Sequence, residues 1–597
     1  MPATSRAART RTVGRAARKP PLSVEALWAI KRIAAPTLSP DGSHACAAVT
    51  SFDMGTNEST TELWLFPTGI AGKAGARARR LTGGDKDSDP KWSPGGDAIA
   101  FTAKRKDDEE PQIYVIAPDG GEARRVTTLA TGCSAIKWFA DGKRIAFVSW
   151  VWPDLKTDAE QAKRKKEKKE NKVKAHVTER AEFRFWDHWL TDGREPHVFV
   201  CDVATGRCRD ALAGTGIALC PWDPKSDDFD ISPDGRELAL SVDLGPEQRM
   251  MALRDIVTVD LATKRKRVLT DKSGTDDATP VYAPDGHALV YHAFDTRRSF
   301  NDQGHLVLRE RASGRTRKLA PRLDRQPQHV EWARDSSSVL FTLEDHGRVG
   351  LWRLSTRVAD ADAAPVAVAA SGGSIGGFAQ SSDGSVIAFE RASAVHPPSL
   401  FACRGDGSAE RGIETLNRAL LARHSMGTVR EVTIKGWGGA PVQMWITYPP
   451  NFDADKKWPL LHTIHGGPHA AHQDTWHFRW NTQVFAGYGY VFFSDELGSF
   501  HWDDMPRVMR QSPHHYVKHA KTPTLVLHGE LDYRVPATQA LQYYDTLKAK
   551  SVPARLVYFP DENHWILKPQ NSRLWYREFF DWVARYAPGG PARGGKS

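Results

Sequence analysis

A short turn followed by an apolar strand recurs seven times in the first two-thirds of the chain, as in SPDGSHACAAV at Ser39 and SPDGRELALSV at Ser232. The seven turns begin at Ser39, Ser93, Phe139, Ser232, Ala283, Ala333 and Ser381. Asp-Gly supplies the positive φ that a tight turn needs, and a second apolar strand follows each copy. A repeat of about 50 residues with several strands per unit is typical of a propeller blade. The repeats therefore predict a seven-bladed β-propeller.

One segment of the repeat region, GGSIGG at Gly372, matches G-x-S-x-G, the pattern that presents a nucleophilic serine on a strand-to-helix turn. No helix-forming run follows Ser374, because the next residues, FAQSSDGSVIAFE, open the seventh repeat. We interpret these glycines as part of a turn between blades. No catalytic role is expected for Ser374.

The net charge of +10 lies in two segments of the 597-residue chain. Residues 1–20 contribute +6 and residues 151–180 contribute +4, so the remainder is formally neutral. A protein that binds nucleic acids would spread its basic residues over a folded face. We expect a disordered basic tail at 1–20, a solvated and partly helical Lys-rich insertion at 155–180, and no nucleic-acid partner.

The sequence shows no sign of a membrane span or a metal site. No stretch approaches the ~20 apolar residues of a spanning helix, and the basic tail lacks the apolar core of a secretory signal. Its Arg-rich composition also suits a mitochondrial transit peptide, which stays open as an alternative. The six cysteines form no CxxC pair and have no histidine at metal-ligand spacing. We expect reduced thiols in a cytoplasmic protein, no membrane partner, no metal and no cofactor.

The last third of the chain has a different pattern of predicted secondary structure. We interpret REVTIKGWGGAPVQMWITYPP as a pair of strands. Two buried strands are expected in WPLLHTIHGGPH and GYGYVFFSDE, and two more strands in TPTLVLHG and ARLVYFP. Helical segments, ATQALQYYDTLKAK and SRLWYREFFDWVARY, follow these last two strands. Buried strands alternating with helices indicate an α/β domain with a mostly parallel sheet.

Three features of this region could carry chemistry. Gly466 and Gly467 follow a strand directly, where backbone N–H groups can approach a developing oxyanion. Asp532 follows the strand TPTLVLHG, where a carboxylate can orient an imidazole. His564 follows the strand ARLVYFP and is a candidate general base. Taken singly, Asp532 could cap a helix and His564 could be structural. Together they follow the Asp-then-His order of α/β-hydrolases.

A propeller followed by HGGP, GELDYRVP and FPDENHWILKPQNSRLWY resembles the prolyl oligopeptidase family of serine peptidases. FRFWDHWLTDGREPHVFV, HGELDYRVP and DENHWILKPQN are particularly similar to its dipeptidyl peptidase V branch. The resemblance runs from Leu22 to the C-terminus and implies an α/β-hydrolase domain whose active site faces the propeller. By the same resemblance, Asp532 and His564 match the triad acid and base. The implied substrate is a short peptide that loses an N-terminal dipeptide, without metal or cofactor.

The sequence departs from this family where the nucleophilic serine belongs. Only 28 residues separate Asp495 from Thr524, and a strand-helix-strand unit alone takes ~30. None of Ser494, Ser499 and Ser512 has a G-x-S-x-G setting, and Leu497 replaces an arginine of the family pattern. An in-frame loss of the central hydrolase segment explains why so few residues lie between Asp495 and Thr524. The strand TPTLVLHG should then pair beside WPLLHTIHG or leave a gap.

These observations predict a basic tail at 1–20, a propeller at 21–423 and an α/β-hydrolase domain at 424–597, internally deleted between 495 and 524. Three interpretations of function remain open at this point. The chain could be a serine peptidase by descent with little activity, a non-catalytic propeller that binds peptides or proteins, or a defective gene product.

Overall fold

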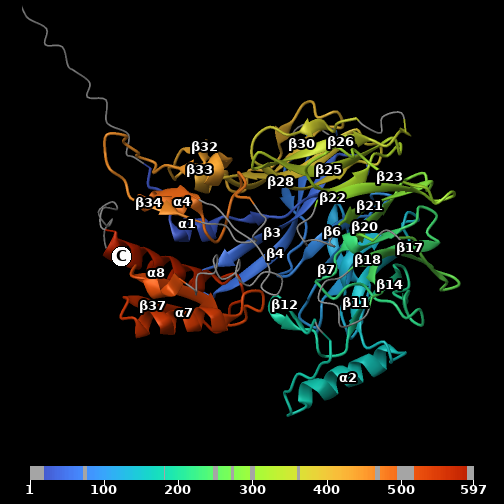
Figure 1. Ribbon diagram of the computed structural model, residues 1–597. Coiled ribbons are helices and arrows are strands. Elements are labelled where there is room, and N and C mark those ends of the chain that lie inside the picture. Colours follow the sequence, from blue (N-terminus) through green and yellow to red (C-terminus); the bar gives the residue numbers. More distant parts are fainter. Residues whose placement is uncertain are drawn as a thin grey trace, which may run out of the picture.

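The computed structural model describes residues 19–71, 77–180, 182–245, 253–270, 274–295, 303–358, 363–463, 471–493 and 516–587. Short antiparallel strands make up most of it, and helices gather near the C-terminal end of the chain. In Figure 1 the sheets coloured dark blue to yellow lie together, and the orange and red C-terminal elements lie beside them. The repeat region and the last third thus occupy different parts of the molecule.

Antiparallel meanders follow one another through the repeat region. The first contains β1 (Arg32–Ile33), β2 (Thr37–Leu38), β3 (His44–Asp53), β4 (Glu58–Pro67) and β5 (Arg79–Arg80). The second contains β6 (Ser88–Trp92), β7 (Ile99–Ala103), β8 (Gln112–Ala117) and β9 (Gly120–Arg125). The third contains β10 (Ser134–Trp138), β11 (Arg144–Val151), β14 (Glu195–Asp202) and β15 (Cys208–Asp210).

The later sheets keep the same pattern. After the short helix η1 (Ser226–Asp228), the fourth contains β16 (Phe229–Ile231), β17 (Glu237–Asp243), β18 (Arg254–Asp260) and β19 (Lys266–Val268). The fifth contains β20 (Asp276–Tyr282), β21 (Ala288–Phe294), β22 (Gly304–Glu310) and β23 (Thr316–Lys318). An eight-stranded sheet follows with β24 (Pro327–Trp332), β25 (Ser338–Asp345), β26 (Arg348–Ser355), β27 (Val366–Ala369), β28 (Ser374–Gln380), β29 (Val386–Ser393), β30 (His396–Arg404) and β31 (Arg411–Gly412).

The eight-stranded sheet consists of two antiparallel halves, because a single parallel pairing, Val349 with Ser374, joins β26 to β28. Ser374 thus opens a strand and the next element is the strand β29, so the G-x-S-x-G segment has no helix behind it. Gly372 and Gly373, at φ 71° and 70°, form the expected turn between blades, whereas Gly376 and Gly377 lie within the strand β28. The Asp-Gly turns also form as expected, with Gly42 at φ 69°.

Neighbouring sheets share buried apolar cores. Leu65 on β4 and Phe101 on β7 belong to one such core, and further cores link each later sheet to the next. Another core joins Leu38 of the first sheet to Val386 of the last. Because both ends of the series meet, the sheets close into a ring, as a propeller requires.

The first strand of several sheets carries a β-bulge. The register shifts between Ser88 and Lys91 in β6, and the bulged residue Asp89 has φ 50°. Equivalent bulges occur in β10, β20, β24 and β28. These strands line a central cavity of 640 Å³. The bulges turn polar side chains such as His329 and Glu331 towards that cavity.

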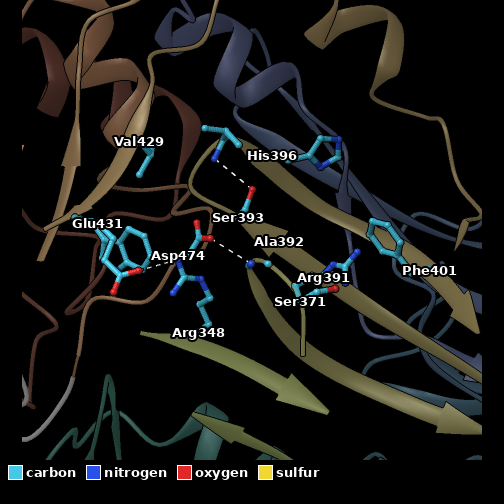
Figure 2. Close-up of a pocket in the computed structure, with 14 residues that line it drawn as sticks. Arg348, Ser371, Arg391, Ala392, Ser393, His396, Phe401, Val429, Glu431 and Asp474 are labelled. Carbon is cyan, nitrogen blue, oxygen red and sulfur yellow. Dashed lines mark hydrogen bonds and ion pairs between the residues drawn. The ribbon is translucent and has the colours of Figure 1, made fainter. Parts of the chain in front are cut away.

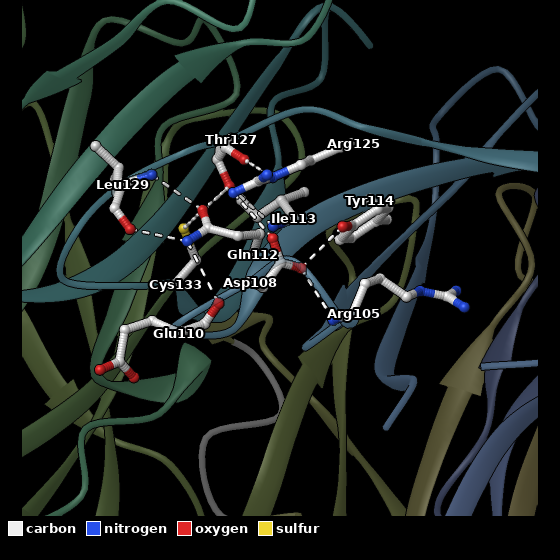
Figure 3. A network of polar contacts seen from close by, with 10 residues as sticks. All are labelled: Arg105, Asp108, Glu110, Gln112, Ile113, Tyr114, Arg125, Thr127, Leu129 and Cys133. Carbon is white, nitrogen blue, oxygen red and sulfur yellow. Dashed lines mark hydrogen bonds and ion pairs between the residues drawn. The ribbon is translucent and has the colours of Figure 1, made fainter. Parts of the chain in front are cut away.

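A buried polar network ties together the loops of the second sheet (Figure 3). Asp108 is 6 % exposed, accepts a 2.8 Å hydrogen bond from the Tyr114 hydroxyl and forms a 2.9 Å ion pair with Arg125. Burial and the Asp108 carboxylate raise the pKa of Tyr114 to about 12. Gln112 bonds to Thr127 in the same network. The Asp108 carboxylate also accepts the Arg105 backbone N–H at 2.9 Å. A buried carboxylate is tolerated here because all three of these partners are in place.

The Lys-rich insertion forms the helix α2 (Asp158–Glu170), as expected for a partly helical segment (Figure 1). Thr157 and Glu160 form a capping box at its start. The buried Gln161 side chain holds the helix to the propeller through the N–H and the carbonyl of Trp152, at 3.0 and 2.9 Å. A small hairpin of β12 (Arg184–Phe185) and β13 (His188–Trp189) follows α2.

The C-terminal part contains two separate sheets. One has the order β32-β33-β35-β34, with β32 (Val429–Lys435), β33 (Pro441–Thr447), β34 (Leu460–His462) and β35 (Val491–Phe493). The other pairs β36 (Thr524–Gly529) with β37 (Ala554–Phe559) in parallel. The helices are α3 (Arg418–Leu421), η3 (Trp437–Gly439), α4 (Thr482–Gly487), η4 (Val517–His519), α7 (Ala537–Ala549) and α8 (Pro569–Tyr586).

The strand expected to be buried in WPLLHTIHGGPH differs in the structure. It forms only the three-residue β34, and Leu460 is 65 % exposed. Among the residues that the structure describes, β34 pairs only with β35, and β36 pairs only with β37, so no ladder of hydrogen bonds joins the two parallel pairs there. A strand loses its burial when no neighbour covers its free edge. Residues 494–515, which hold the expected junction, lie outside the described residues.

The N-terminal helix α1 (Val24–Ala29) packs against both the C-terminal helices and the propeller strand β3. Trp28 shares a core with Phe485 of α4 and Tyr576 of α8, and its indole N–H donates a 3.0 Å hydrogen bond to Ser572. Ser23 caps the start of α1 by accepting from the Ala26 N–H. The two ends of the described chain are therefore joined in one core.

The six cysteines are all free thiols, and Cys46, Cys133, Cys201 and Cys403 are buried. Within the described ranges, no helix is long and apolar enough to cross a membrane. No group of three or more His, Cys, Asp or Glu side chains in those same ranges could hold a metal ion.

Candidate active site

Asp532 and His564, the two side chains that the sequence pairs as acid and base, are in contact. The Nδ1 of His564 donates a 2.8 Å hydrogen bond to Oδ2 of Asp532. Asp532 is 4 % exposed, and its Oδ1 accepts the backbone N–H groups of Arg534 and Val535 at 3.0 and 2.8 Å. All three of these bonds are accepted by carboxylate oxygens of Asp532. The arrangement fixes one imidazole tautomer and leaves Nε2 free of Asp532.

The two turns that carry Asp532 and His564 are bonded to each other. The Leu531 N–H donates to the Glu562 carbonyl at 3.0 Å. Gly529 ends β36 beside this contact, and a Cβ there would lie 2.3 Å from the Asn563 carbonyl oxygen. Any larger residue would push the turns apart. The buried Glu562 carboxylate holds the second turn by accepting the Leu567 and Lys568 N–H groups.

The hairpin that follows α2 reaches from the propeller to this pair. The Tyr533 N–H donates to the Trp186 carbonyl at 2.8 Å, and the Asn563 amide donates to Asp187 at 2.6 Å. The Trp186 ring lies 5.6 Å from His564 and 5.1 Å from Trp565, centroid to centroid. Trp186 has φ 50°, an unfavourable backbone conformation for an aromatic residue. The surrounding contacts hold this strained turn against the imidazole.

The other expected site residues are not brought to this pair within the described structure. Gly466 and Gly467 lie outside the described residues. In the part of the chain that the structure does describe, no serine or threonine hydroxyl is hydrogen-bonded to His564. The pair therefore has an orienting carboxylate and an imidazole, and no nucleophile in contact with it there.

Two comparisons with known proteins point to the same group of peptidases. The sequence profile of the Prolyl oligopeptidase family matches residues 495–589, a range that includes both Asp532 and His564. Dipeptidyl-peptidase 5 of Porphyromonas gingivalis is 24% identical over 684 aligned positions, which cover 95% of this chain and 95% of that protein. Both comparisons show that this chain is similar to the prolyl oligopeptidase family.

Two further proteins are similar to this chain over most of its length. Dipeptidyl-peptidase 5 of Schizosaccharomyces pombe is 23% identical, with 69% of this chain and 75% of that protein covered. The solved structure of Pyrococcus horikoshii acylaminoacyl peptidase matches with a TM-score of 0.74 and 15% identity, covering 96% of this chain and 99% of that one. The structural match shows a shared fold, a propeller with a hydrolase domain.

A second cavity, of 480 Å³, lies where the last propeller sheet meets β32 and β33 (Figure 2). Asp474 joins the two parts by accepting the Gly373 and Ala394 N–H groups at 3.2 and 2.8 Å. Arg348 pairs with Glu431 at 2.9 Å across the same cavity. Because these charged groups are already paired, we interpret the cavity as part of the contact between the propeller and the C-terminal part of the chain.

The sequence did not predict the contact between the hairpin and the catalytic-type turns. FRFWDHW supports the family resemblance, yet nothing in its spacing places Trp186 beside His564. The sequence feature that could have indicated this contact is the high density of aromatic residues at 183–189, next to a polar insertion. Such residues are costly to leave in solvent, so they indicated a docking surface of some kind.

Proposed function

We propose that this chain is a dipeptidyl-peptidase-like member of its family that keeps a triad acid and base, Asp532 and His564, and lacks the nucleophilic serine. It would then bind short peptides and hydrolyse them slowly or not at all. The observation that carries this proposal is the 2.8 Å contact between Asp532 and His564, with no hydroxyl partner for His564 in the described residues.

The chemistry of the pair explains why the loss matters. A carboxylate holds the imidazole so that Nε2 can take a proton from a serine hydroxyl and later return it to the leaving amine. Without that hydroxyl, no acyl-enzyme forms. Loss of the nucleophile alone lowers kcat by ~10⁶ in a well-studied serine protease. Asp532 and His564 would then serve to shape a binding surface.

Three observations support loss of the central hydrolase segment. The alignment with the P. gingivalis relative spans 684 positions, more than the 597 residues of this whole chain, so that relative has matched-region residues with no counterpart here. Only 28 residues lie between Asp495 and Thr524. The exposed Leu460 of β34, and the lack of hydrogen bonding between the two parallel pairs among the described residues, are what removal of middle strands would leave.

The same proposal assigns the parts of the chain. Counting β24–β27 and β28–β31 as separate blades, the propeller has seven blades within residues 21–423. The hydrolase domain occupies 424–597 with its deletion between 495 and 524, and residues 1–20 form a basic tail. Gly466 and Gly467 keep their proposed role as backbone donors to a peptide carbonyl, without a metal or cofactor.

A fluorophosphonate probe and a chromogenic dipeptide substrate test the proposal on the full chain. We expect no stoichiometric labelling and no turnover that depends on His564. Isothermal titration with a short peptide should nevertheless detect binding. Stoichiometric labelling, or turnover that His564→Ala removes, would refute the loss of the nucleophile. Re-reading the gene around codons 498 to 502 separates a natural deletion from an assembly error.

A further inference from the structure

Arg479 is a partly buried cation placed next to the candidate active site. It lies in the loop just before α4, and its guanidinium carbon is 4.7 Å from the Trp480 ring centroid and 4.3 Å from that of Trp565. Trp565 follows His564 directly in the sequence and packs on Trp186. The guanidinium thus lies in the aromatic cluster that surrounds the Asp532–His564 pair.

This guanidinium has no acidic partner among the described residues. Its Nη1 is buried and makes no hydrogen bond in the structure. Burial lowers the pKa of Arg479 to about 10, and no carboxylate opposes that effect. Buried cations in proteins are normally paired, because removal from water without compensation costs several kcal/mol. Arg348 and Arg555 pair with glutamates, whereas Arg479 has no ion-pair partner in the ranges that the structure describes.

His477 adds a second donor that faces the same place. Its Nδ1 accepts the backbone N–H groups of Arg479 and Trp480, at 3.2 and 2.9 Å, so the ring proton of the neutral imidazole must be on Nε2. That Nε2 lies 3.3 Å from Nη2 of Arg479. Burial, with a contribution from Arg479, lowers the pKa of His477 to about 3, which keeps the ring neutral. Two N–H donors therefore face each other with no acceptor between them.

We propose that Arg479 and the Nε2–H of His477 form a binding site for the carboxylate of a peptide. A carboxylate oxygen between the two donors would accept from both and would supply the missing negative charge. A guanidinium stacked on indole rings keeps its N–H edge available for a planar, bidentate acceptor.

The position of the site indicates which carboxylate it would take. This step rests on the proposed function, because Trp565 links Arg479 to the turn of His564, where a peptide would lie. A short peptide offers its C-terminal carboxylate, and a longer one an Asp or Glu side chain. The two sources share one chemistry and are separated by the choice of ligands.

Isothermal titration of the full chain with three peptides tests the site: Ala-Ala-Phe as the free acid, its C-terminal amide, and the amide Ala-Glu-Phe-NH2. A hydrogen bond to a charged group contributes about 1.5–3 kcal/mol, so the acid should bind at least about ten-fold more tightly than the amide. Recovery of affinity by the Glu-containing amide would identify a side-chain carboxylate, and its absence a C-terminal one. Equal affinity of all three peptides would overturn the site and leave peptide binding intact.

Substitutions assign the effect to these residues. Arg479→Met should remove the preference for the acid, whereas Arg577→Met, at an arginine on α8 whose side chain is 65 % exposed, should keep it. His477→Asn retains an acceptor for the two backbone N–H groups and removes Nε2, so we expect a reduced preference in a folded protein. A preference that persists in Arg479→Met would overturn the proposal.

Benzoate, a carboxylate without a peptide group, tests the site independently of the proposed function. Because Trp480 and Trp565 contact Arg479, benzoate should change the intrinsic tryptophan fluorescence of the wild type in a saturable way, and not that of Arg479→Met. If no peptide binds and benzoate does, the proposed function fails and the carboxylate site stands. If benzoate gives the same response in both proteins, the site fails.

Discussion

Trp186 of the propeller hairpin and His564 of the C-terminal part lie edge to face, with ring centroids 5.6 Å apart and planes at 61°. The indole therefore covers one side of the imidazole. An aromatic pair of this kind contributes about 0.5–1.5 kcal/mol beyond its area. Trp186→Ala should accordingly speed the modification of His564 by diethyl pyrocarbonate about two- to ten-fold, measured by peptide mass spectrometry.

Trp458→Ala is the matched control for this experiment, since Trp458 packs on Phe452, away from the hairpin. It should leave the rate at His564 unchanged. If Trp186→Ala also leaves that rate unchanged, the indole does not shield the imidazole.

Glu390, on β29, gives the propeller a pH-dependent stability. It is 9 % exposed, and burial raises its pKa to about 7, opposed only by the Gly376 N–H. The folded state therefore keeps a proton that the unfolded chain loses above its ordinary pKa. The stabilisation is complete below about pH 4.5 and is lost as the pH rises to about 7.

Glu390→Gln should remove this dependence. Its free energy of unfolding should equal that of the wild type near pH 4 and exceed it by up to roughly 3 kcal/mol at pH 8, from the size of the shift. Urea unfolding at both pH values measures the difference. Glu310→Gln serves as the control, because that carboxylate is a solvent-facing partner of Arg315. A constant difference between wild type and Glu390→Gln across this range would contradict the prediction.

The network around Asp108 should be sensitive to loss of its central carboxylate. Asp108→Ala leaves the Tyr114 hydroxyl and the Arg125 guanidinium without their acceptor, which should lower the free energy of unfolding by about 2 kcal/mol. Tyr114→Phe removes a single bond and should cost about 1 kcal/mol. The double variant should cost less than the sum. Strict additivity in urea unfolding would show that the two groups are not coupled.

The anchoring of α2 can be tested by limited proteolysis. Gln161→Leu removes both bonds to the Trp152 backbone and leaves those groups unpaired, so the helix should detach more often. Trypsin should then cut the Lys-rich helix several-fold faster. Glu167→Gln, which affects only an exposed 3.9 Å ion pair with Lys163, should change the rate little. Equal cutting of Gln161→Leu and wild type would show that other contacts hold α2.

Restoring the missing segment should restore the nucleophile. In the chimera, residues 496–523 are replaced by the stretch that the P. gingivalis relative carries between its counterparts of Asp495 and Thr524. A fluorophosphonate probe should label the chimera and not the wild type, and His564→Ala should slow that labelling. A folded chimera that stays unlabelled would contradict the proposal that this segment alone is missing.

The repeat region could be predicted well because its signals are local. Asp-Gly turns such as that at Gly42 and apolar runs such as β7 fix the sheet period without knowledge of distant partners. The helical part of the insertion was predictable from composition, and the structure adds only how Gln161 anchors it. The contact between Asp532 and His564 followed from their places after consecutive strands.

The missed features depend on contacts between distant segments. The exposure of Leu460 depends on which strands lie beside β34, and an apolar run cannot reveal its neighbours. The contact of Trp186 with His564 depends on how the propeller and the hydrolase part dock. The lone charge of Arg479 becomes visible only when the atoms around it are known. Periodicity carries none of this information.

The helix α1 also has a consequence for the order of synthesis. Its apolar face is completed by α4 and α8, and Trp28 and Ser572, which bond to each other, are 544 residues apart. At 5–20 residues per second, a ribosome needs roughly 30 to 110 s to make the second after the first. During that time Leu22, Leu27 and Trp28 have no native partners on α8. The nascent chain therefore exposes an apolar N-terminal segment, which chaperones can bind, until its last helix emerges.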